Sequence, residues 1–130
     1  MLLFGHRFIS SKLFYHISDI DDITHTPPSS TLILSFNEQN LDIISHCNLN
    51  QLSFALSVQS VTDLVYASAL HASYIIVQQD LAKTAQDLAQ NYLFDAKVLV
   101  RIEDDKEIEE MALLGVDGVI YPSAIIKITS

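Results

Sequence analysis

The spacing of short apolar runs constrains the fold of this 130-residue chain more than any other feature of its sequence. Five runs rich in Val, Ile, Leu, Phe and Tyr begin 22, 21, 24 and 20 residues apart. They are TLILSF at 31–36, SFALSV at 53–58, YIIVQ at 74–78, VLVRI at 98–102 and GVIY at 118–121. Near-continuous apolar runs of this length are typical of strands that are buried on both faces. Their even spacing predicts a repeated β–α unit.

The segments between the runs have helical periodicity. After Ser60 the apolar residues recur at i, i+3, i+4 and i+8, with a small serine at i+7, and Ser60 itself is a favourable N-cap. The segments after Asp80 and after Asp104 show the same pattern, and Gly115 is well placed to end the latter helix. A shorter helix is expected at 41–47. Each interval between two apolar runs therefore contains one helix.

Both ends of the chain depart from this regular pattern. The segment KLFYHI at 12–17 indicates a further strand, and a loop or short helix follows it up to the turn that contains Pro27 and Pro28. The apolar stretch at 1–9 is read as a strand or docking arm. Ser123 is expected to cap a last half-helix through Ile128. We expect one domain, with the N-terminal strand and proline-containing loop over 1–30 and repeated β–α units over 31–130.

Consecutive strands that are joined by helices form a parallel sheet, because the crossover connections are right-handed. The sequence therefore predicts an α/β fold with a parallel sheet of five to six strands and helices on both faces, a flavodoxin-like three-layer arrangement. The alternative is a half or partial (β/α)8 barrel.

Charge and cysteine content exclude several classes of protein. Acidic residues outnumber basic ones by 16 to 7, which gives a net charge of −9, and the basic residues are scattered along the chain. A nucleic-acid partner is therefore not expected. The single cysteine, Cys47, excludes an internal disulfide and favours a reducing compartment. No apolar window approaches the length of a membrane span, so we expect a cytoplasmic protein with no membrane partner.

The segment at 98–127 resembles the last two units of phosphate-binding (β/α)8 barrels of the kind found in the alpha subunit of tryptophan synthase. The matching residues are Gly115, Asp117, Gly118, Val119, Ile120, Ser123, Ala124 and Ile125. The resemblance implies a phosphate held by backbone amides near Ser123. Pro122 stands where the family has glycine and removes one amide donor. The acidic catalytic residues of the family belong to earlier units, which have no match here, so the resemblance does not imply its activity.

Polar residues follow the predicted strands at the edge where parallel α/β sheets bind ligands. Arg101 is the one permanent cation among them, and Gln59, Gln78 and Tyr121 can donate or accept hydrogen bonds. Together with Ser123, these residues are the predicted ligand-binding site, and an anionic small molecule is the predicted ligand.

Some of these polar residues also have a purely structural interpretation. Ser60, Asp80, Asp104 and Ser123 precede or begin helical segments and can serve as N-caps. In this interpretation Arg101 is a structural residue paired with a carboxylate.

Motifs for metal, cofactor or catalytic chemistry are not evident. His6, His16 and His25 lie in a stretch rich in aspartate, but no two have the i, i+4 spacing that brings two imidazoles onto one helix face. The three glycines of the chain cannot form a nucleotide-binding loop. We therefore predict no metal site, no cofactor and no catalytic residue.

Two functions remain as hypotheses. The first is a non-catalytic α/β domain that acts by forming a homodimer or by docking a protein partner. A small domain with so many apolar residues leaves helix or sheet faces exposed that such association would bury. The second is a binding protein or enzyme for a phosphorylated small molecule at the C-terminal edge of the sheet.

Overall fold

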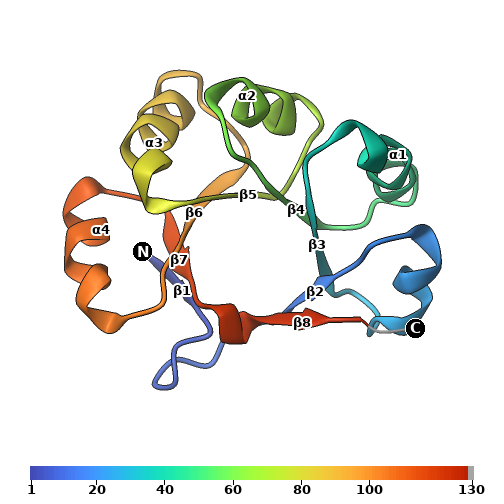
Figure 1. Cartoon of the computed structure of the whole chain (residues 1–130), viewed down its shortest axis with the longest axis horizontal. Helices are drawn as coiled ribbons and strands as arrows, with labels where there is room; N and C mark the ends of the chain where they lie inside the picture. The colour runs from blue at the N-terminus through green and yellow to red at the C-terminus, as the bar shows by residue number, and fades with distance from the viewer. Residues whose placement is uncertain (129–130) are drawn as a thin grey trace.

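Eight parallel strands form one curled sheet in the computed structural model, which describes residues 1–128 (Figure 1). The strands are β1 (Leu2–Phe4), β2 (Phe14–His16), β3 (Thr31–Ser35), β4 (Phe54–Ser57), β5 (Tyr74–Val77), β6 (Lys97–Arg101), β7 (Gly118–Ile120) and β8 (Ile125–Lys127). Their order across the sheet is β1-β7-β6-β5-β4-β3-β2-β8. Consecutive strands from β2 to β7 are thus neighbours, as repeated β–α units require.

Four α-helices lie outside the ring of strands (Figure 1): α1 (Leu41–Leu49), α2 (Val61–Ala69), α3 (Ala82–Asn91) and α4 (Ile108–Leu114). Short 3-10 turns are η1 (Ile20–His25), η2 (Glu38–Asn40), η3 (Gln79–Leu81), η4 (Asp105–Glu107) and η5 (Pro122–Ala124). Among residues 1–128 no helix combines the length and the hydropathy that crossing a membrane takes.

The parallel α/β class is confirmed, and of the two predicted arrangements the partial barrel is the observed one. The three-layer arrangement with helices on both faces is not observed, because the sheet curls and one of its faces turns inward. The sheet also has more strands than the five to six predicted. The short strands β1 and β8 account for the difference.

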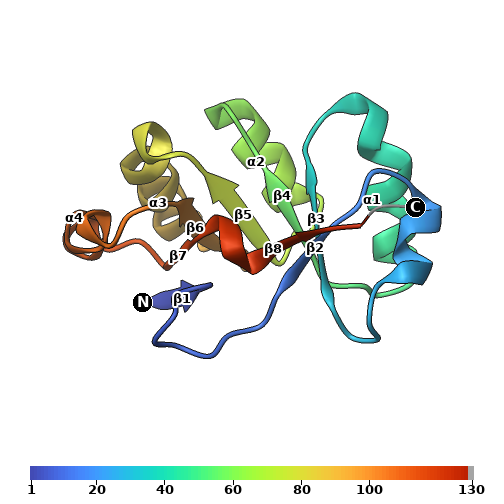
Figure 2. The same ribbon diagram turned by 60° about the horizontal axis from the view of Figure 1, so that its bottom comes forward.

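The two ends of the chain meet the sheet in different ways. The strand predicted at 12–17 is present as β2, and the stretch at 1–9, read as a strand or docking arm, contains β1, which pairs with β7. Figure 2 shows the connection that leads from β1 to β2. The predicted half-helix from Ser123 through Ile128 is wrong, because only the turn η5 forms and β8 follows it. Ile125 and Ile126 are β-branched and suit a strand, and β8 pairs with β2 over its whole length.

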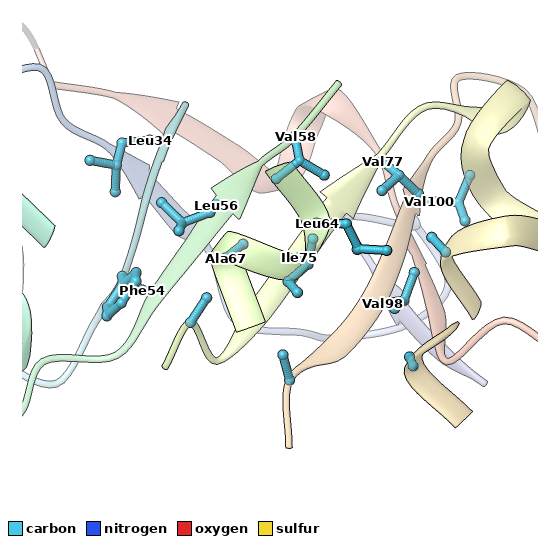
Figure 3. Close-up of a cluster of buried hydrophobic side chains, with 14 of the residues drawn as sticks. Leu34, Phe54, Leu56, Val58, Leu64, Ala67, Ile75, Val77, Val98 and Val100 are labelled. Atoms are coloured by element: carbon cyan, nitrogen blue, oxygen red, sulfur yellow. The ribbon is translucent and has the colours of Figure 1, made fainter. Parts of the chain in front are cut away.

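The curl divides the apolar residues into two cores. The inner core contains one buried side chain from each of the strands β1 to β7 and one from η5: Phe4, Phe14, Ile33, Ala55, Ile76, Leu99, Ile120 and Ala124. The rings of Phe4 and Phe14 meet edge to face there, with centroids 5.1 Å apart. The outer core lies between strands and helices, where Leu64 and Ala67 of α2 pack against the strands (Figure 3). Alternation along each strand supplies both cores.

All four α-helices are followed by the same backbone turn. Gln51, His71, Leu93 and Gly115 each have a positive φ, of 55°, 68°, 53° and 79°. The next residue in each case donates its amide to a carbonyl five residues earlier, as Leu52 does to Cys47 at 2.9 Å. This is the Schellman arrangement, in which an apolar residue after the turn packs back on the helix. The turn gives each β–α unit the same exit geometry.

The edge strand β1 is fastened near the start of β8. Tyr121 donates its amide to the Phe4 carbonyl at 2.9 Å, and the Ser123 hydroxyl donates to the Gly5 carbonyl at 2.8 Å. Gly118 allows β1 to approach β7, because a Cβ at that position would lie 2.7 Å from the Leu2 Cβ. These contacts bring the two edges of the sheet together at η5.

Candidate functional site

A layer of polar side chains lies above the inner core, at the carboxyl ends of the strands. Its members each stand two positions after an inward-facing residue of a strand: His16, Ser35, Ser57, Gln78, Arg101 and Lys127. Because alternate residues of a strand share a face, these six side chains belong to the inner face of the curled sheet. We call these residues the mouth layer.

The mouth layer borders a cavity of about 420 Å³, which we call the mouth cavity. His16, Ser35, Ser57, Arg101 and Lys127 line it, and its apolar surface comes from Ile33, Leu34, Ile76, Pro122 and Ile125. The volume is in the usual range for small-molecule sites, about 300–1,000 Å³. His16, Ser57 and Arg101 are half-buried, whereas Ser35 and Lys127 are exposed. The cavity is therefore open to solvent and has an apolar inner end.

Basic residues dominate the charge of this cavity. Arg101 and Lys127 are permanent cations, His16 is a third basic group, and no acidic residue lines the cavity in the described part of the chain. Within residues 1–128 the two ion pairs join His6 to Asp105 and Lys83 to Asp87, so neither Arg101 nor Lys127 has an ion-pair partner there. The structure thus gives no support to a paired structural role for Arg101.

A second, smaller cavity adjoins the first. It has a volume of about 220 Å³ and is lined by Ser57, Val58, Gln59, Gln78, Asp80 and Leu81. Ser57 borders both cavities. The predicted ligand-binding residues Gln59 and Gln78 therefore lie beside the cavity that Arg101 lines.

The other two predicted ligand-binding residues make internal hydrogen bonds. The Ser123 hydroxyl donates to Gly5, and the Tyr121 hydroxyl donates to Asp105 at 2.5 Å. The amides of Ala124 and Ile125 are used within η5, and Pro122 has none. The structure does not bring Tyr121 or Ser123 into the mouth cavity, and a ligand role for them stays a prediction.

Tyr121 belongs to a cluster with His6 and Asp105. His6 Nδ1 accepts the Phe8 amide at 3.1 Å, so Nε2 carries the proton and donates to Asp105 at 3.2 Å. Burial and the bond to Asp105 raise the pKa of Tyr121 to about 12. The bond from Tyr121, more than that from His6, lowers the pKa of Asp105. Both nitrogens of His6 are thus used in hydrogen bonds, and the cluster anchors the N-terminal segment to the residues after β7 and in η4.

The N-cap interpretation is confirmed for two of the four residues that it named. Ser60 accepts the Asp63 amide at 3.1 Å, and Asp104 forms a capping box with Glu107. Hydrogen bonds from the Gln79 side chain and the Glu103 amide lower the pKa of Glu107. Asp80 lies inside η3, and Ser123 lies inside η5. Neither is an N-cap, so this part of the interpretation is wrong.

Sequence reasoning found Arg101 and Gln78 of the mouth layer and missed His16, Ser35, Ser57 and Lys127. The available signal is the polar residue that stands two positions after an apolar one at the end of each strand. Sequence reasoning misses Lys127 because the half-helix expected through Ile128 includes it. It misses His16, Ser35 and Ser57 because the expected open sheet has no enclosed face on which their side chains would gather.

No protein-family model matches the chain, and no curated protein is significantly similar to it. The resemblance to the alpha subunit of tryptophan synthase therefore stays a prediction. In the part of the chain that the structure describes, no three His, Cys, Asp or Glu side chains are grouped so that they could hold a metal ion.

Proposed function

We propose that this protein binds a small phosphorylated molecule in the mouth cavity. The observation that carries the proposal is the grouping of Arg101, Lys127 and His16 around one cavity, without a carboxylate lining it among residues 1–128. This grouping occurs in a chain whose net charge is −9. A basic cavity in so acidic a protein favours an anionic ligand over a cationic one.

The two permanent charges favour a phosphate monoester over a carboxylate. A phosphate monoester carries close to two negative charges at neutral pH, which Arg101 and Lys127 can balance. The guanidinium can donate two parallel hydrogen bonds to phosphate oxygens, and the ammonium acts as a point charge. A single carboxylate would leave one of the two cations unbalanced. The proposal is limited to binding and includes no chemical step.

Calorimetric titration with inorganic phosphate and with ethyl phosphate tests the proposal. Binding is expected for the unmodified protein, and Arg101→Gln is expected to weaken it about tenfold or more, because it removes a charge-assisted hydrogen bond. Lys127→Gln should act in the same direction. Lys97→Gln is the matched control, because Lys97 is exposed at the opposite end of β6. Absence of binding, or equal binding by Arg101→Gln, would reject the proposal.

Self-association remains a second candidate because several large apolar side chains are exposed. Phe8, Tyr92, Leu93 and Leu113 are 72%, 73%, 83% and 82% exposed. A homodimer that covers some of them would gain apolar burial. Light scattering at micromolar concentration tests this candidate, and a mass of 14.5 kDa throughout would reject it. Docking of a protein partner on the same side chains stays a prediction.

A further inference from the structure

We infer that the ligand is a phosphate monoester with one anionic end only, and that its other end is a short, uncharged, hydroxyl-bearing chain. This inference rests on the proposed function and specifies its ligand. It follows from how charge is distributed around the mouth layer, which divides into a basic arc and a neutral arc.

The basic arc lies where the two ends of the chain meet. His16 on β2 and Lys127 on β8 occupy the same register of paired strands, so their side chains are neighbours. Arg101 ends β6, and β6 pairs with β7, which leads through η5 into β8. Pro122 lies between Arg101 and Lys127 in this arc and also lines the cavity. An anionic group placed here has basic groups on both sides.

The neutral arc lies on the three strands between β2 and β6. Ser35 on β3 and Ser57 on β4 share one register, and Gln78 follows β5 directly. These hydroxyl and amide groups both donate and accept hydrogen bonds. They suit ligand hydroxyl groups, and they have no charge with which to balance a second anion.

The smaller cavity extends the neutral arc outward and adds a repulsive element. Ser57 joins it to the main cavity, and Gln59 and Gln78 provide further amide groups. Asp80 also lines this smaller cavity. A phosphate or carboxylate at the far end of a ligand would approach the Asp80 carboxylate and be disfavoured. Hydroxyl groups in the same place can donate hydrogen bonds to it.

Three probes that share a three-carbon chain separate these ligand classes by calorimetry: glycerol phosphate, propyl phosphate and propanediol bisphosphate. Glycerol phosphate is expected to bind about tenfold more tightly than propyl phosphate, because hydroxyl groups of the neutral arc gain partners. It should also bind more tightly than the bisphosphate. Ser57→Ala is expected to abolish the preference for glycerol phosphate over propyl phosphate. Ser10→Ala is the control, because Ser10 is exposed and outside both cavities.

The outcomes distinguish this inference from the proposed function. If none of the probes binds, the proposed function fails and the inference fails with it. If glycerol phosphate and propyl phosphate bind equally, or the bisphosphate binds most tightly, while Arg101→Gln weakens all three, the proposed function stands and this inference is overturned. A preference for glycerol phosphate that survives in Ser57→Ala would remove the neutral arc as its cause and would also overturn the inference.

Discussion

The Tyr121 hydroxyl donates a hydrogen bond of 2.5 Å to Asp105 Oδ1, and the same carboxylate oxygen lies 3.2 Å from His6 Nε2. One oxygen atom thus joins the residue after β7, the turn η4 and the segment after β1. The side chain of His6 is only 8% exposed, whereas that of Asp105 is 51% exposed. The half-exposed Asp105 carboxylate therefore covers the buried His6 side chain and anchors the N-terminal segment.

Stability should fall at both extremes of pH because of this cluster. The pKa of Tyr121 is raised to about 12 in the folded protein, from 10.0. The unfolded chain thus releases this proton first, and the contribution of Tyr121 is complete below about pH 10 and lost as pH rises through about 12. The pKa of Asp105 is lowered, so its contribution is present above the ordinary value of 3.8 and is lost as pH falls through the lowered pKa.

Tyr121→Phe tests this pH dependence. Denaturant unfolding followed from neutral to alkaline pH should show a smaller loss of stability above pH 10 in the variant, and the tyrosine that titrates near pH 12 by ultraviolet absorbance should be absent. Tyr92→Phe is the control, because Tyr92 is 73% exposed. Identical alkaline profiles for Tyr121→Phe and the unmodified protein would contradict the expectation.

Gln86→Ala is expected to destabilise the protein by about 1–3 kcal/mol, because it leaves a backbone amide without its acceptor. Gln86 is 2% exposed, and its Oε1 accepts the Asp117 amide at 2.9 Å. Asp117 in turn accepts the Val98 amide at 2.9 Å, so the substitution affects the junction of α3, β6 and β7. Urea unfolding measures the effect. Gln90→Ala, an exposed position on the same helix, should change stability by less than about 0.5 kcal/mol.

Leu93→Gly is expected to stabilise the protein by about 1 kcal/mol. Leu93 has a φ of 53° and is 83% exposed, so glycine relieves the left-handed backbone and loses little buried surface. Gly115→Ala at the equivalent turn after α4 should lower stability by a similar amount, although no atom lies within 4 Å of the added Cβ. Thermal and urea unfolding of the two variants check the pair. A destabilised Leu93→Gly would indicate that its side chain is covered by association.

Gly118→Ala is expected to loosen β1 from β7 and to cost about 1–3 kcal/mol. The new methyl group would lie 2.8 Å from the Leu2 carbonyl oxygen and 2.9 Å from Leu99 Cδ2. Hydrogen exchange should become faster at the Tyr121 amide, which donates to the Phe4 carbonyl. Exchange at the Val58 amide, which donates to the Ile76 carbonyl across the sheet, serves as the reference. Unchanged exchange at Tyr121 would contradict this account of the glycine.

The regular part of the fold could be predicted because its pattern is local. The runs that became β3 to β7 and the amphipathic segments that became α1 to α4 each carry their own periodicity. The strands β1 and β8 have three residues each and depend on partners that are distant in sequence. Their pairing with β7 and β2 decides how the sheet ends, and no local pattern reports it.

The same difference explains which part of the candidate site could be predicted. Arg101 follows a clear apolar run, and ligands commonly bind at the carboxyl end of such a strand. His16 and Lys127 become neighbours only because β2 pairs with β8. In addition, a run that is apolar on both faces has no alternation of apolar and polar residues. The sequence therefore does not indicate which of its residues face the inside of the curled sheet. The sequence could thus identify the polar residues at the ends of strands, but it could not show that their side chains surround one cavity.

The inner core and the mouth layer consist of different residues, and this separation has a consequence for how the protein can evolve. Each side chain of the mouth layer stands two positions after a residue of its own strand that packs in the inner core. A single mutation of one of these polar residues can therefore change the charge or hydrogen-bonding groups of the cavity while the inner core keeps its packing. Selection can therefore alter the surface of the cavity one residue at a time.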